Sequence, residues 1–139
     1  MSADDPQKIW NEYHSKIKAR RLAEAAVINL ELNKNSINGN AELVLDFVFF
    51  TQDEVGAKGI AKQLSENYEM SILKNGDHWL VNGTSRPYSV KFTAAQHLSW
   101  VEFMHDVALS YGCIFSTWKI TEPKRNLVWS NEEIETDSE

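Results

Sequence analysis

Residues 41–64, AELVLDFVFFTQDEVGAKGIAKQL, place a strand pattern directly before a helix pattern. In the first part, alternate residues such as Leu45 and Phe47 share one side of an extended chain, and the other side is also largely apolar, which is typical of a central strand. TQDE then has capping-box spacing beginning at Thr51, and apolar residues recur at helical spacing after it. The stretch therefore predicts a buried strand followed by a helix over 52–67.

The downstream sequence continues with a hairpin, a second helix and a last strand. YEMSIL and NGDHWLVNG predict two strands joined by a turn at Asn75 and Gly76. TAAQ is a second capping-box sequence beginning at Thr93, and the apolar spacing after it predicts a helix over 94–111. CIFSTWKI, residues 113–120, predicts the last strand.

The sequence upstream of the central strand predicts a leading helix over about 6–32. Its Asp-Pro start suits a helix N-terminus. VINLEL, residues 27–32, also alternates like a strand that would form a hairpin through NSINGN, but the Ala-rich run before it favours the helix. The positions expected to form the buried stripe of this helix are Ile9, Trp10, Tyr13, Ile17, Leu22, Ala23, Ala26, Val27 and Leu30.

The element order after the leading helix is β-α-β-β-α-β. Such a split β-α-β repeat predicts an α+β, ferredoxin-like fold, in which a four-stranded antiparallel sheet carries both helices on one face. The leading helix is expected to pack elsewhere on the sheet or at its edge. We expect a single domain over 1–130, followed by a mobile acidic tail over 131–139.

Composition and charge limit the possible functions. The chain has 139 residues, 42% of them apolar, which is enough for one domain with a substantial core. Its longest apolar run is too short to cross a bilayer, its N-terminus lacks the layout of a signal peptide, and one cysteine requires no oxidising compartment. We therefore expect a cytoplasmic protein without a membrane contact.

The net charge of −6 comes mainly from the last nine residues, which carry five acidic side chains. A dedicated nucleic-acid-binding domain usually has a basic stripe, so we expect no direct contact with nucleic acid. An acidic tail either keeps a protein in solution or approaches a basic partner.

The sequence contains few candidates for catalysis. Cys113 follows a predicted helix C-terminus, whose dipole disfavours a thiolate, so it is interpreted as a small, semi-buried apolar residue. His97 and His105 share a helix but lack the i, i+4 spacing of metal ligands. The sequence also lacks phosphate-binding, dinucleotide-binding and Gly-x-Ser-x-Gly motifs. We therefore expect a non-enzymatic protein without a metal or other cofactor.

Trp118 allows two interpretations. Strand alternation groups it with Ser116 and Ile120, apart from Phe115, so it either packs under the helices or anchors a partner near the end of its strand. The residues expected to contact a partner are Trp118, Lys119, Arg86, Tyr88, Glu132, Glu133, Glu135 and Asp137.

The runs DFVFFTQDEVGAKGIAKQLSENYEMSI and YGCIFSTWKITEP resemble the regulator of ribonuclease activity B family, and the similarity extends from about Ala25 to Glu139. It rests on the leading helix and strand, the Asn67-Tyr68 strand entry, the Thr117-Trp118 pair and the acidic tail. The resemblance implies a small cytoplasmic protein that binds the endoribonuclease ribonuclease E and lowers its activity. The family's target is a basic, largely disordered scaffold, and opposite charges speed such an encounter.

Two other functions stay open at the level of sequence. An immunity-type protein that neutralises a toxin would also be small, acidic and without catalytic groups. A small-molecule-binding regulatory module is the other alternative, because this fold class carries many functions.

Overall fold

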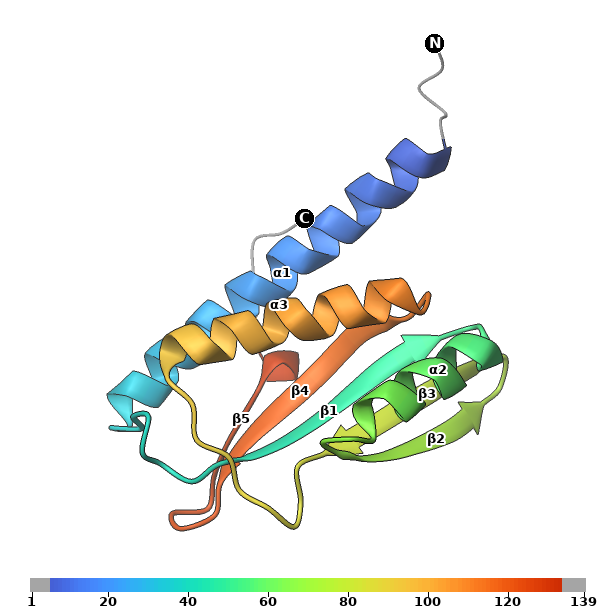
Figure 1. The fold of residues 1–139 in the computed structure, drawn as a ribbon. Coiled ribbons are helices and arrows are strands. Elements are labelled where there is room, and N and C mark those ends of the chain that lie inside the picture. The colour runs from blue at the N-terminus through green and yellow to red at the C-terminus, as the bar shows by residue number, and fades with distance from the viewer. Residues whose placement is uncertain (1–5, 134–139) are drawn as a thin grey trace.

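The computed structural model describes residues 6–133, which form three α-helices and one five-stranded antiparallel sheet (Figure 1). The elements in chain order are α1 (Pro6–Lys34), β1 (Val44–Thr51), α2 (Glu54–Leu64), β2 (Glu69–Asn75), β3 (His78–Thr84), α3 (Ala94–Ser110), β4 (Ile114–Glu122), β5 (Leu127–Ser130) and the 3-10 helix η1 (Asn131–Glu133). The strand order is β2-β3-β1-β4-β5. This architecture confirms the α+β class predicted from the sequence.

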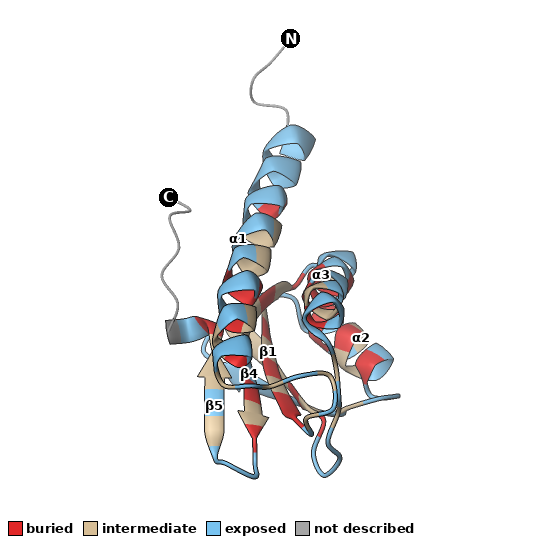
Figure 2. Cartoon of the chain, turned by 90° about the vertical axis from the view of Figure 1, so that its left-hand side faces the viewer, coloured by how far each residue is buried: buried red, intermediate tan, exposed pale blue. Residues whose placement is uncertain are grey.

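The sheet has one face that the helices cover and one that they leave open. Alternate residues of β1 show this division, because Leu45, Phe47 and Phe49 are buried while Asp46 and Val48 are partly exposed. Figures 1 and 2 show α2 and α3 on the covered side, with α1 running beside α3. The two predicted helices therefore share one face of the sheet, as expected.

Helix α1 extends to Lys34, so the helical interpretation of residues 27–32 is confirmed and the strand alternative is wrong. It packs along α3, where Lys18 forms ion pairs with Glu102 at 3.2 Å and Asp106 at 3.3 Å. Its N-terminal half extends beyond the sheet (Figure 2).

The predicted apolar stripe of α1 is wrong at most of its positions, although Leu22 packs against the core. Trp10 is 47% exposed and Leu30 is 63% exposed, whereas the buried positions are His14, Glu24, Ala25, Ile28 and Leu32. The reason is that α3 and the β4–β5 side of the sheet fix the contact face, and this face includes polar groups that bond to the sheet. Apolar periodicity alone follows only apolar contacts, so it selected the wrong side of the helix.

The helix ends match the sequence prediction at α3 but not at α2. Thr93 and Gln96 form the predicted capping box of α3. The N-cap of α2 is Asp53, whose carboxylate accepts from the Val55 N–H at 3.0 Å. Thr51 instead accepts from the Asp53 N–H and donates to the main chain after α3, so it joins the two helix ends rather than capping α2.

Strand β5 is the element that the sequence pattern failed to predict. The chain turns back at Asn126, whose φ is 57°, and Trp129 then pairs with Ile120 of β4. A strand of four residues is too short to give a clear alternation, so only its pairing with β4 reveals it. The sheet therefore has five strands where four were predicted.

A β-bulge in β4 changes which residues face the core. Val48 of β1 pairs with Thr117, but the next residue, Phe49, pairs with Phe115, so β4 contains one residue more than β1 at this point. Phe115 and Trp118 consequently lie on the same face, with stacked rings whose centroids are 5.2 Å apart. The prediction that simple alternation separates these two side chains is wrong.

Side chains from both ends of the chain satisfy the main-chain groups freed by the bulge. Arg21 of α1 donates to the Phe115 carbonyl at 2.7 Å. The Asn131 amide donates to the Ser116 carbonyl at 3.2 Å and accepts from the Trp118 N–H at 2.8 Å. Unpaired buried main-chain groups are costly, so these bonds allow the bulge to exist inside the fold.

Asn131 corrects the predicted boundary of the tail. Its side chain is only 4% exposed, so the segment 131–139 is not a mobile tail from its first residue. The sequence prediction missed this because an Asn beside acidic residues has the composition of a solvent-exposed end. Residues 134–139 lie outside the described part of the chain.

Candidate functional site on the open face of the sheet

Polar side chains form rows across the open face of the sheet. The strand register places Asp46 opposite both Lys119 of β4 and Thr84 of β3, and Thr84 in turn lies opposite Glu69 of β2. Ser130 of β5 extends this row beyond Lys119. A second row consists of the polar residues Thr117, Asn82 and Ser71, with the apolar Val48 between Thr117 and Asn82. Directly opposite residues in antiparallel strands project on the same side, so each row is continuous.

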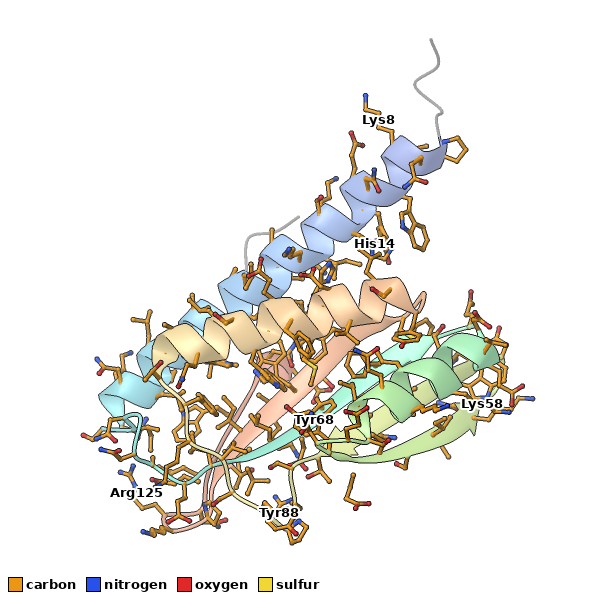
Figure 3. The ribbon with its side chains drawn as sticks, in the orientation of Figure 1. Lys8, His14, Lys58, Tyr68, Tyr88 and Arg125 are labelled. Atoms are coloured by element: carbon orange, nitrogen blue, oxygen red, sulfur yellow. The ribbon has the colours of Figure 1, made fainter. Side chains whose placement is uncertain are left out.

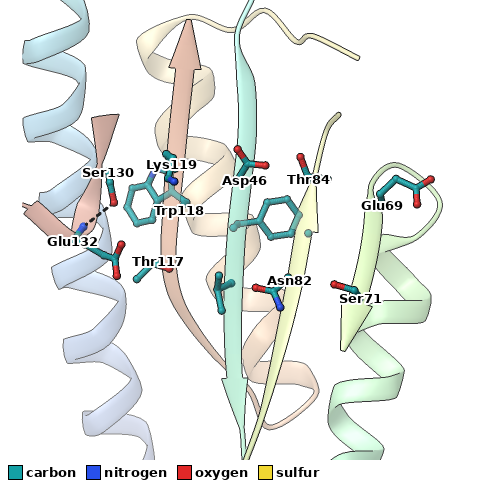
Figure 4. A pocket seen from close by; sticks show the side chains of 13 residues that line it. Asp46, Glu69, Ser71, Asn82, Thr84, Thr117, Trp118, Lys119, Ser130 and Glu132 are labelled. Carbon is teal, nitrogen blue, oxygen red and sulfur yellow. Dashed lines mark hydrogen bonds between the residues drawn. The ribbon is translucent and has the colours of Figure 1, made fainter. Parts of the chain in front are cut away.

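These rows form the floor of a shallow hollow of about 390 Å³ (Figure 4). Glu69 lies at the β2 end of the hollow, and Glu132 lies at the other end, beyond β5. The Glu132 N–H donates to the Ser130 hydroxyl at 3.1 Å, which fixes the start of η1 beside the last strand. The hollow therefore extends from one edge of the sheet to the other.

The charged groups of the hollow are mainly acidic. Asp46, Glu69 and Glu132 line it, against the single cation Lys119 among the described lining residues. Arg86 approaches from the loop after β3 and forms an ion pair with Asp46, whose carboxylate oxygen lies 3.5 Å from the guanidinium. The two ends of the hollow thus carry carboxylates, and the paired charges lie between them.

The structure brings together some of the predicted contact residues and separates others. Lys119 and Glu132 line the hollow, and Arg86 reaches it through Asp46. Tyr88 is 75% exposed on the loop before α3, and the hollow does not include it. The description of the structure does not extend to the side chain of Glu133 or to Glu135 and Asp137.

Trp118 belongs to the core. It is 1% exposed, and its indole N–H donates to Nε2 of His97 at 3.1 Å. The first interpretation of Trp118, a side chain packed under the helices, is therefore confirmed. Its second interpretation, an exposed anchor for a partner, is wrong because the bulge turns this side chain toward α3.

His97 is held as a neutral acceptor. Its Nδ1 lies 2.8 Å from Oδ1 of Asn29, and the Asn29 amide donates to the Ala94 carbonyl, so Nδ1 carries the hydrogen and Nε2 accepts from Trp118. Burial lowers the pKa of His97 to about 4. The ring therefore joins α1, α3 and β4 and has no lone pair left for catalysis.

Cys113 has the environment of a structural thiol. The residue is 1% exposed, and burial raises the pKa of its thiol to about 11. Its Sγ lies 3.6 Å from the Tyr111 carbonyl. The prediction of a small structural residue is confirmed, and the burial is more complete than the semi-buried position that was expected.

Residues 6–133 contain neither a metal-binding cluster nor a helix suited to span a membrane. In this part of the chain, His, Cys, Asp and Glu side chains do not gather in groups of three or more that could hold a metal ion. Across the same residues, none of the helices combines the length and apolar character needed to cross a membrane.

Sequence reasoning missed the roles of Asp46 and Glu69. Asp46 interrupts an otherwise apolar strand, and Glu69 begins a run in which polar Ser71 follows Met70. A polar residue at every second position is the usual sign that one face of a strand meets solvent. That signal was present, but the row across the sheet becomes visible only once the strand order is known.

The fold and the hollow define a class of small α+β domains in which one sheet face is packed under helices and the other presents polar side chains. No protein-family model matches the chain, and no curated protein matches it.

Proposed function

We propose that this chain is a non-catalytic regulatory protein that binds another protein through the open face of its sheet. The observation that carries the proposal is the pair of carboxylates, Glu69 and Glu132, at the two ends of the hollow, outside the central charges of Lys119 and the Asp46–Arg86 ion pair. A concave surface with an excess of one charge attracts a segment of the opposite charge and speeds association. The favoured partner is therefore basic.

The dimensions of the hollow suit an extended segment. Neighbouring strands lie about 4.8 Å apart, so the five strands span roughly 19 Å. An extended chain advances about 3.3 Å per residue, so about six residues would cross the sheet from Glu69 to Glu132. Basic side chains near the two ends of such a segment would meet the two end carboxylates, and the polar floor would bind its main chain.

The resemblance to the regulator of ribonuclease activity B family supports a ribonuclease E-like endoribonuclease as the proposed partner. The basic, non-catalytic scaffold of that enzyme would occupy the hollow, and its occupancy would lower RNA turnover in the cytoplasm. We include in this proposal a ferredoxin-like arrangement for the first four strands with α2 and α3, to which α1 and β5 are additions. Direct binding of RNA is not part of the proposed mechanism.

Charge reversal at Glu69 tests the proposal. Glu69 is exposed on an edge strand, so Glu69→Lys keeps the fold while it removes one end of the acidic lining. We expect at least several-fold weaker binding to the purified basic scaffold of ribonuclease E at low salt, and a parallel loss of inhibition of RNA cleavage. Glu12→Lys is the matched control, because Glu12 is exposed on α1 and does not line the hollow.

Three outcomes separate the possible functions. If the Glu69 and Glu12 variants bind the scaffold equally well, the hollow is not the binding site. Failure of the unmodified chain to bind the scaffold, together with tight binding of a purified toxin, would replace the proposal with the immunity alternative. Failure to bind either protein would favour a small-molecule module.

A further inference from the structure

A second cavity, of about 250 Å³, lies on the helix-covered side of the sheet, between β1, residues 90–92 and the first turn of α3. Its floor is buried, because it includes Leu45 and His97. Its mouth reaches solvent at Lys91 and Gln96, which are both exposed. The cavity and the acidic hollow therefore belong to opposite faces of the sheet.

Aromatic rings form the walls of this cavity and hold one another in place. The Trp100 indole N–H donates to the Tyr68 hydroxyl oxygen at 3.0 Å. The Phe47 ring packs edge-on against both, with centroids 4.9 Å from Tyr68 and 5.8 Å from Trp100. Phe92 closes the other side, 5.5 Å from His97. Walls fixed in this way lose little freedom when a ligand enters.

The polar groups at the mouth are hydrogen-bond donors. Lys91 supplies an ammonium group. The Gln96 carbonyl oxygen already accepts from the Thr93 N–H, which leaves its NH₂ group to donate outward. Tyr68 accepts from Trp100, which leaves its own O–H to donate.

The side-chain acceptors of this lining, on Tyr68, Gln96 and His97, already accept hydrogen bonds from the protein. Both ring nitrogens of His97 are already engaged. Among the described residues that line the cavity, none has a carboxylate, in contrast to the hollow on the other face. The mouth also lies at the positive end of α3, which favours a negative charge. These features together select an anion with a flat apolar body.

We propose that this cavity binds a small aromatic carboxylate, with its ring between Phe92 and Trp100 and its carboxylate at Lys91. The volume lies just below the roughly 300 Å³ at which ordinary ligand sites begin, so the ligand is a single-ring or similarly small molecule. The inference goes beyond the proposed protein partner, because each face of the sheet then has its own binding site.

Phenylacetate is the probe that tests the proposal, in titrations of the full chain followed through the Trp100 indole resonance by NMR. We expect saturable shifts at millimolar concentration. Phenethylamine carries the same ring with a cation, and acetate carries the same anion without a ring, so neither should reproduce these shifts. The absence of saturation with phenylacetate, or equal shifts with phenethylamine, would overturn the proposal.

Lys91→Gln adds a test that keeps the fold, because Lys91 is exposed. We expect it to weaken phenylacetate binding about tenfold, the effect of losing a hydrogen bond to a charged group. Lys8→Gln is the matched control, since Lys8 lies near the free end of α1, far from Tyr68 (Figure 3). Equal affinity in the Lys91 and Lys8 variants would contradict the assigned position of the carboxylate.

Discussion

The side chain of Asn131 binds the main chain of Trp118, with its Oδ1 2.8 Å from the Trp118 nitrogen. The same side chain donates to Glu24 at 3.0 Å and to the Ser116 carbonyl at 3.2 Å. One amide therefore joins α1, the bulge of β4 and η1. Because all three bonds lie in a largely buried region, each lost partner would leave a polar group without solvent.

Asn131→Ala should lower the free energy of unfolding by about 2–3 kcal/mol, because it leaves several buried polar groups without a hydrogen-bond partner. Denaturant unfolding measures this change. Asn67→Ala is the control, since Asn67 is exposed, and it should change stability little. Equal stability of the two variants would mean that the network does not support the bulge.

Truncation separates Asn131 from the acidic residues after it. Deletion of 131–139 should lower the melting temperature because it removes the bonds to the bulge, whereas deletion of 134–139 retains them. If the end of the chain also attracts a basic partner, the shorter deletion should slow association and flatten its salt dependence. Association rates at low and high salt provide that measurement, and the two melting curves test the role of Asn131.

Trp118→Ala should cost about 3–5 kcal/mol of stability, the usual effect of truncating a fully buried large aromatic residue. Trp10→Ala is the comparison, since Trp10 is 47% exposed and should be far more tolerant. Chemical unfolding of both variants gives the two values. If the Trp118 variant melts like the unmodified chain but no longer binds its partner, Trp118 is a contact residue and its assignment to the core is contradicted.

Stability should fall as the pH is lowered from about 6.5 toward 4. The pKa of His97 is about 4 in the folded chain, below the ordinary value of 6.5 given for histidine. The unfolded chain therefore takes up a proton in this range that folded His97 does not, while above about 6.5 both forms are neutral. The contribution of His97 reaches at most about 1.4 kcal/mol per pH unit. Burial lowers the pKa of His14 and His105 as well, so they act in the same direction.

His97→Gln isolates the part of this dependence that belongs to His97. Unfolding free energies at neutral and mildly acidic pH should differ less in the variant than in the unmodified chain, even if the variant is less stable at both. An identical difference in the two proteins would show that other groups cause the acid sensitivity.

Cys113→Ser should leave partner binding unchanged, because the thiol is buried and its pKa is raised to about 11. The native thiol should also react slowly with a disulfide reagent near neutral pH and quickly after unfolding. Rapid modification of the folded chain, accompanied by loss of binding, would argue for a functional thiol.

The parts of the fold predicted correctly are those whose signals are local. The apolar run from Leu45 to Phe49 and the capping box at Thr93 each lie within a few residues, and their physics needs no distant partner. The prediction of the buried face of α1 failed because that face depends on contacts with α3. The prediction that Phe115 and Trp118 face opposite sides of the sheet failed because a bulge adds one residue to β4 between them. A shift of one residue reverses the direction of the side chains beyond it.

The candidate site shows the same limit. Lys119 was predicted as a contact beside Trp118, and Glu132 as part of the acidic tail, but their neighbours Asp46 and Glu69 lie on strands much earlier in the sequence. Only the order β2-β3-β1-β4-β5 brings them into one hollow. Strand order results from packing over the whole domain, which no single stretch of sequence contains.

The bond between Glu24 and Asn131 joins residues 107 positions apart, and this has a consequence for synthesis. At about 5–20 residues per second, roughly 5–20 s pass between the appearance of the two residues. The strands β1 to β3 can pair during that interval, but the bond between α1 and η1 must wait until Asn131 has been synthesised. Asn131 can therefore bond to α1 only after α3 and β4 have been synthesised, so a nascent chain that stops short of it lacks the bonds by which Asn131 joins Glu24 to the bulge of β4.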